Sequence, residues 1–116
     1  MENSRETVLT AAFVIPENGV RDSTISFWLD KVIGLYPNLK KIYISLEFVQ
    51  KNKVKYWAKT QGISCIIGDQ LVAFCQENDP DKAVICFFSS RNKAPFIYAG
   101  ILAKAARCDR HVVSPM

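Results

Sequence analysis

Five short apolar runs alternate with four segments of helical character along this chain of 116 residues. The runs cover Val8–Ile15, Lys41–Ser45, Ile63–Ile67, Ala83–Phe88 and His111–Ser114. Strands that alternate with amphipathic helices form β-α-β units, and such units build a mostly parallel sheet. Because the length is that of one domain, we predict a single doubly wound α/β domain over residues 1–116. Its sheet is expected to be five-stranded and mostly parallel.

Two common strand orders fit five parallel strands with right-handed crossovers. One is the Rossmann-like order 3-2-1-4-5, and the other is the flavodoxin-like order 2-1-3-4-5. The loop after the first strand borders the point where the strand order reverses in both. The loop after the fourth strand completes the crevice in the first order, and the loop after the third strand does so in the second. Either order predicts a ligand site at the carboxyl ends of the strands.

Composition narrows the class of protein. Lys and Arg number 15 against 11 Asp and Glu, and the net charge of +4 permits an anionic partner without demanding one. No apolar run approaches the roughly 20 residues of a membrane span, and the polar start MENSRETV is not a secretory signal. The four cysteines form no Cys-x-x-Cys pair and the chain has one histidine, so we expect no metal site. We predict a cytoplasmic protein without a cofactor and without membrane association.

Two polar loops are the best candidates for a ligand site. The loop Ser89–Lys93 joins a buried strand to a helix N-terminus, where free N–H groups and the helix dipole favour an anion. Arg91 can hold a phosphate in a bidentate way. The candidate ligand-binding residues are Asn18, Gly19, Arg21 and Asp22 in the first loop and Ser89, Ser90, Arg91, Asn92 and Lys93 in the second. The alternative is that both are solvated loops built from ordinary turn residues.

Evidence for catalysis is sparse. The chain has neither the glycine-rich dinucleotide fingerprint nor the Walker A motif. Asp69 ends the third run and could orient a ribose hydroxyl or cap the next helix, and Glu47 has a similar position after the second run. We interpret His111 as a structural or surface histidine. Whether the chain is an enzyme stays open, and the sequence favours a non-catalytic role.

A stripe of lysines follows one flank of the second helix. Lys51, Lys55 and Lys59 are spaced four residues apart. Such a stripe could follow a nucleic-acid backbone, but a solvated helix face is the more common meaning. The interleaved aromatic residues of a single-strand binder are missing. Nucleic-acid binding is therefore left open and not favoured.

The last helix, from Pro95 to about Arg107, is apolar around most of its circumference. Helical spacing predicts a sheet-facing set of Ala94, Tyr98, Ile101 and Ala105. The opposite face would hold Phe96, Ala99, Gly100, Ala103 and Ala106. A helix that is apolar all round is buried on both sides, either by the third helix or by another subunit. We predict a homodimer with the interface residues Phe96, Ala99, Gly100 and Ala103.

Several short motifs follow one another along the chain in the order that is found in a known family. The loop after the first strand ends in Arg21-Asp22, and the next helix is followed by the strand IYIS. A helix end of the form Trp-Ala-Lys-x-x-Gly then covers Trp57–Gly62. From roughly Val8 to Val113 this order resembles the SLOG-type Rossmann-like proteins, which include relatives of nucleoside 2-deoxyribosyltransferases. The resemblance implies a ligand of the nucleotide or nucleoside class.

The chain departs from that family at its glycine-rich positions. Leu46–Val49 replaces the glycine-rich loop that is expected after the second strand. Ser89–Lys93 and an apolar helix replace the glycine-rich segment and the glutamate that are expected after the fourth. These departures favour a binding or scaffolding role over catalysis.

We therefore predict a non-catalytic binding module for a nucleotide-like or other phosphorylated small ligand, bound at the loops after the first and fourth strands. The first alternative is a regulatory or protein-interaction protein that acts through the last helix and binds no small molecule. A second is a small hydrolase or glycosyl-transferring enzyme that uses Asp22, Asp69 or Glu47.

Overall fold

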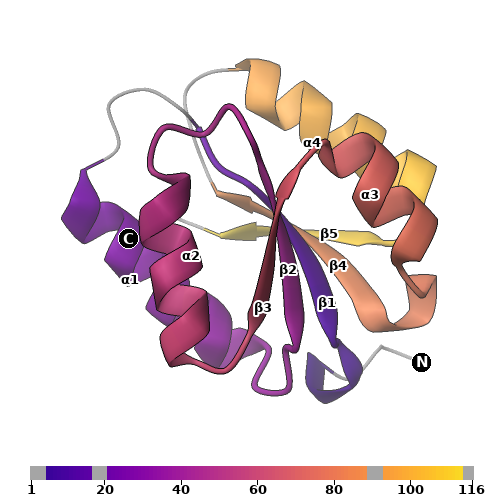
Figure 1. Cartoon of the computed structure of the whole chain (residues 1–116). Coiled ribbons are helices and arrows are strands. Elements are labelled where there is room, and N and C mark those ends of the chain that lie inside the picture. The colour runs from indigo at the N-terminus through magenta and orange to yellow at the C-terminus, as the bar shows by residue number, and fades with distance from the viewer. Residues whose placement is uncertain (1–4, 17–20, 89–92, 114–116) are drawn as a thin grey trace.

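The structure, a computed structural model, describes residues 5–16, 21–88 and 93–113. Its centre is a five-stranded, all-parallel sheet with the strand order β3-β2-β1-β4-β5 (Figure 1). The strands are β1 (Thr10–Val14), β2 (Lys41–Ser45), β3 (Ser64–Gly68), β4 (Ala83–Phe88) and β5 (Asp109–Val113). The α/β class and the Rossmann-like order are confirmed, and the flavodoxin-like order is wrong.

Four α-helices cover the sheet in two layers, one on each face (Figure 1). The helices are α1 (Asp22–Leu35), α2 (Lys51–Thr60), α3 (Gln70–Glu77) and α4 (Lys93–Ala106). Two 3-10 turns, η1 (Arg5–Thr7) and η2 (Pro80–Lys82), precede β1 and β4. Helices α1 and α2 pack on one face, and α3 and α4 on the other. Within the described ranges, no helix is long and apolar enough to cross a membrane.

The face under α1 and α2 carries the larger core. Trp28 of α1 is 3% exposed and belongs to this core. Its ring lies 5.2 Å from the ring of Phe88, which in turn lies 5.2 Å from the ring of Phe13. Burial of such large side chains supplies most of the stabilisation of a small domain. This aromatic row ties α1 to the two central strands.

The second face corrects the predicted orientation of α4. Ala99, Leu102 and Ala106 are buried against the sheet, and Ile97 and Ile101 are 58% and 53% exposed. The predicted sheet-facing residues Ala94, Ile101 and Ala105 are exposed, and only Tyr98 of that set is partly buried. The helix is rotated from the expected phase because apolar residues on every side leave periodicity with little to distinguish one face from another.

The same rotation relocates the predicted interface residues. Ala99 is fully buried and Ala103 partly buried within the chain's own α3–α4 layer, so the notion that they form an outer face is wrong. Phe96 packs on the ring of Phe87 at 5.6 Å and under the Arg110 guanidinium at 4.9 Å. A Cβ on Gly100 would lie 3.2 Å from Arg110 Nη1, so this glycine makes room for the arginine. Whether the chain dimerises stays a prediction.

Two helices end in the same way with different residues. The N–H of Gly62 (φ +73°) donates to Lys59 O, and the N–H of Ile63 donates to Ala58 O. At the end of α4, Arg107 (φ +56°) and the residue after it donate in the same pattern to Lys104 O and Ala103 O. This pattern requires one residue in the left-handed backbone conformation, which glycine adopts freely and arginine adopts only with strain.

Candidate functional site

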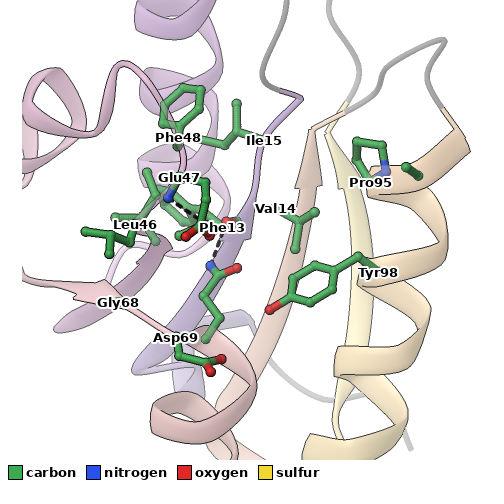
Figure 2. A pocket seen from close by; sticks show the side chains of 14 residues that line it. Phe13, Val14, Ile15, Leu46, Glu47, Phe48, Gly68, Asp69, Pro95 and Tyr98 are labelled. Atoms are coloured by element: carbon green, nitrogen blue, oxygen red, sulfur yellow. Dashed lines mark hydrogen bonds between the residues drawn. The ribbon is translucent and has the colours of Figure 1, made fainter.

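A cavity of about 540 Å³ opens at the carboxyl edge of the sheet (Figure 2). The ends of β1, β2 and β3 form its floor and one side, and the first turns of α4 form the other side. Apolar walls come from Phe13, Ile15, Leu46, Phe48 and Pro95. Its polar lining comes from Ser45, Glu47, Asp69, Gln70 and Tyr98.

The cavity lies where two neighbouring strands part. The pairing of β1 with β2 ends at Phe13 and Ile44. By contrast, β1 stays paired with β4 through Val14, and β2 stays paired with β3 through Ser45. Beyond their last pair, β1 and β2 therefore diverge, and the space between their ends belongs to the pocket.

Gln70, the first residue of α3, joins these two strand ends. Its Nε2 donates to Phe13 O and to Tyr43 O, and both distances are 2.8 Å (Figure 2 shows the bond to Phe13 as a dashed line). The side chain is 2% exposed and lines the pocket. A buried amide that satisfies two backbone carbonyls is strongly held, because either carbonyl would otherwise lose a hydrogen bond.

Glu47 is held at the pocket by its own turn. The Ser45 hydroxyl donates to Glu47 Oε1 at 2.9 Å, and the Glu47 N–H donates to Ser45 Oγ at 3.2 Å. These two bonds orient the carboxylate just after β2, although the residue is exposed. Asp69 is oriented in a comparable way, since its Oδ1 accepts from Leu71 N at 3.0 Å and from Val72 N at 3.4 Å. Asp69 therefore caps α3, as one of the two sequence interpretations predicts.

Tyr98 approaches both carboxylates from the other side. In Figure 2 its ring extends from α4 and its hydroxyl points toward Asp69. Burial raises the pKa of Tyr98, and the negative charges of Asp69 and Glu47 raise it further. The hydroxyl is therefore protonated at neutral pH. The inner end of the pocket combines two carboxylates, a carboxamide and a neutral phenol.

Only three of the predicted ligand-binding residues are described. Arg21 and Asp22 begin α1, are exposed and do not line the cavity, and Asp22 Oδ2 lies 4.0 Å from Lys53 Nζ. Lys93 begins α4, next to two residues that do line it. Asn18, Gly19, Ser89, Ser90, Arg91 and Asn92 lie outside the described residues. Among the described residues at the two predicted loops, Ile15 at the start of the first and Ala94 and Pro95 after the second line the pocket.

The structure brings together residues that the sequence treated separately. Glu47 and Asp69 share one pocket, and Asp22 stands apart from them. Gln70 and Tyr98 were missed as polar lining residues. Strand order 3-2-1-4-5 places the ends of β1, β2 and β3 side by side, and Gln70 lies two residues after the third strand, so this order is the signal that points to it. The contribution of Tyr98 needed the true phase of α4.

His111 does not line the pocket. The ring of His111 lies 6.0 Å from the ring of Tyr36 in an edge-on contact. Burial, followed by the charges of Arg5 and Lys31, lowers the pKa of His111. In the part of the chain that the structure describes, no three His, Cys, Asp or Glu side chains gather as a metal site would require.

The comparisons with known proteins found no match for this chain. No protein-family model matches it, and neither a curated protein nor a solved structure matches it. The resemblance to the SLOG-type proteins stays a prediction, and the geometry of the pocket is the observation that bears on function.

Proposed function

We propose that this chain is a non-catalytic binding module for a nucleotide-like or other phosphorylated small ligand, held at the carboxyl edge of the sheet. The pocket is the observation that carries the proposal. Open α/β sheets bind ligands outside the carboxyl ends of their strands, where the strand order reverses. Here the order reverses at β1, whose end lines the cavity. A volume of about 540 Å³ is in the range of small-molecule sites.

Three features favour a nucleotide-like ligand. Glu47 follows β2, the place where dinucleotide-binding folds put a carboxylate that accepts from ribose hydroxyls. Phe13 and Phe48 supply apolar surface for a base. The 14-residue helix α4 begins beside the pocket with Lys93, and a helix N-terminus with a lysine favours a phosphate. Arg91 and its neighbours in the preceding loop enter the proposal from the sequence alone.

The hydrogen bonds of the two carboxylates within the fold support the non-catalytic role. Asp69 caps a helix, and Glu47 is bound to Ser45. Their presence in one pocket is also what a hydrolase or glycosyl-transferring enzyme would use. Incubation of the protein with nucleosides and measurement of free base by chromatography distinguish the two roles, because a binding module releases no free base. The four cysteines, all free thiols, support a cytoplasmic location for this module.

A protein-interaction role is the second candidate, and one observation favours it. Ile97 and Ile101 lie one turn apart on the outer face of α4 and are both more than half exposed. Neighbouring exposed apolar residues mark many interaction surfaces. This role predicts a stable oligomer and no small-molecule ligand. The mass in solution distinguishes it from the first proposal.

Titration calorimetry with nucleoside monophosphates tests the proposal. We expect binding to the wild type and a several-fold loss in Lys93→Ala, because the ammonium group beside the pocket attracts a phosphate. Lys55→Ala is the matched control, since it removes the same charge from an exposed position on α2. Equal losses in the two variants would indicate diffuse attraction by the basic surface. Absence of binding to every nucleotide would overturn the proposal.

A further inference from the structure

We infer that the inner end of the pocket is a hydrogen-bond acceptor site, which takes the end of its ligand that carries N–H or O–H donors and excludes phosphate and carbonyl oxygens. The inference rests on the proposed function, because it states which end of a nucleotide-like ligand enters. It concerns the side of the pocket formed by Glu47, Asp69 and Gln70, which faces Tyr98.

Gln70 presents only an acceptor to this space. Its amide nitrogen carries two hydrogens, and one is donated to Phe13 O and the other to Tyr43 O. The opposite orientation of the amide would set Oε1 against two carbonyl oxygens, so the two strands decide which atom faces them. The one polar atom left for a ligand is Oε1, and no described residue donates to it. This atom belongs to a side chain that is 2% exposed and lines the pocket.

The two carboxylates repeat this arrangement. Asp69 commits Oδ1 to the backbone of α3, and Glu47 commits Oε1 to the Ser45 hydroxyl. Among the described residues, none donates to the second oxygen of either carboxylate. The Ser45 hydroxyl already donates its hydrogen to Glu47. Among the described side chains that line the pocket, Tyr98 is therefore the one that could donate a hydrogen bond to a ligand as well as accept one.

Three fixed acceptors select the chemistry of the ligand. A phosphate or carbonyl oxygen placed against them would face lone pairs, and both partners would lose their hydrogen bonds to water without replacement. A hydroxyl pair or an amino group would satisfy them. In a nucleotide these donors are the sugar hydroxyls and the exocyclic amine of the base. The phosphate then lies away from these acceptors, toward Lys93 at the N-terminus of α4.

Calorimetric titration with three matched ligands tests the inference: AMP, purine riboside 5′-monophosphate, which lacks the amino group, and 2′,3′-dideoxy-AMP, which lacks the sugar hydroxyls. We expect at least one analogue to bind about tenfold more weakly than AMP or worse, since hydrogen bonds to charged groups contribute that much. The analogue that loses affinity identifies the donor that enters. Equal affinities for all three would overturn the inference and leave the proposed function standing.

Asp69→Asn replaces the acceptor that faces the pocket by a donor and keeps the helix cap. Asparagine caps a helix as well as aspartate does, so its oxygen replaces Oδ1 and its NH2 group faces the pocket. We expect about a tenfold loss for AMP and a smaller preference over the weaker analogue. Asp79→Asn is the matched control, because Asp79 caps η2 in the same way at 3.0 Å from Asp81 N and does not line the pocket. An equal loss in both variants would overturn the inference.

Fragments separate this inference from the proposed function. The NMR signals of the Gln70 side-chain amide are followed during titration with 4-aminopyrimidine against pyrimidine, and with cis-tetrahydrofuran-3,4-diol against tetrahydrofuran. A shift by either donor fragment and not by its partner, with no nucleotide bound, would overturn the proposed function and support the acceptor site. No shift by any fragment or nucleotide would overturn both.

Discussion

The two faces of the sheet differ in how many residues are buried beneath their helices. Under α1 and α2, twenty buried residues of the described chain form one cluster, and under α3 and α4 ten do. The first face includes both tryptophans, and the buried apolar residues that α3 and α4 add to the second face are Phe74, Ala99, Leu102 and Ala106. The second face also leaves Ile97 and Ile101 exposed on its outer surface. The first face supplies most of the core, and the second supplies Tyr98 and the first turns of α4 on one side of the pocket with fewer buried residues beneath them.

The core itself gives the largest expected effect. We expect Trp28→Ala to lower the free energy of unfolding by about 3–5 kcal/mol, and Leu102→Ala by about 2–3 kcal/mol, because the larger side chain leaves the larger cavity in the better packed face. Denaturant titration of both variants measures the difference. A loss for Leu102→Ala that equals or exceeds that of Trp28→Ala would contradict the comparison.

Each face also holds one buried tyrosine. Burial and the neighbouring Cys86 raise the pKa of Tyr36 on the first face to about 12. On the second face burial, followed by the Glu77 carboxylate, raises the pKa of Tyr43, whose hydroxyl donates to Glu77 Oε1 at 2.6 Å. A raised pKa means that the unfolded chain releases the proton first, so stability is lost as pH rises above about 10.

Replacing Tyr43 tests its hydrogen bond. Tyr43→Phe should lower the free energy of unfolding by about 1 kcal/mol at pH 7 and should make stability less sensitive to alkaline pH. Tyr36→Phe is the control on the other face, and it should also flatten the alkaline limb with a smaller loss at pH 7. Thermal unfolding between pH 7 and pH 11 measures both. An unchanged alkaline limb in Tyr43→Phe would show that this tyrosine is not the titrating group.

The helix ends provide a smaller contrast. Helix α2 on the first face ends with Gly62 in the left-handed conformation, and α4 on the second face ends with Arg107 there. Arg107→Gly should raise the free energy of unfolding by about 0.5–1 kcal/mol, because glycine adopts this conformation without strain. Gly62→Ala should lower it by a similar amount. Denaturant midpoints compare them, and a destabilised Arg107→Gly would mean that its side chain contributes more than the strain costs.

The exposed side of α4 gives the smallest expected change in stability. Ile101→Glu should alter the free energy of unfolding by less than about 0.5 kcal/mol, because the residue is exposed. The same variant should convert a dimer to a monomer if this face is covered by a second copy. Light scattering coupled to size exclusion reports the mass. A monomeric wild type at high concentration would contradict the predicted homodimer.

The fold could be predicted from the sequence to a large extent. Strands β2 and β4 have the predicted bounds, and the four helices lie between the strands as the pattern predicts. The signals were local: apolar runs for the strands, and Asp69 as a candidate cap for the helix that follows it. The site could be predicted only as an edge of the sheet. Glu47 and Asp69 were recognised as candidates, but nothing local said that they share one pocket.

The sequence by itself determined the α/β class, the number of strands and the alternation of strands with helices, because period and turn chemistry act over a few residues. Tertiary structure decided between the two strand orders, since both satisfy the same local pattern and the same handedness. It also decided the phase of α4, where apolar residues surround the helix and packing of Ala99 and Leu102 selects the buried side. The parting of β1 and β2 around Gln70 depends on carbonyls 57 and 27 residues away, so only the folded chain could reveal the pocket.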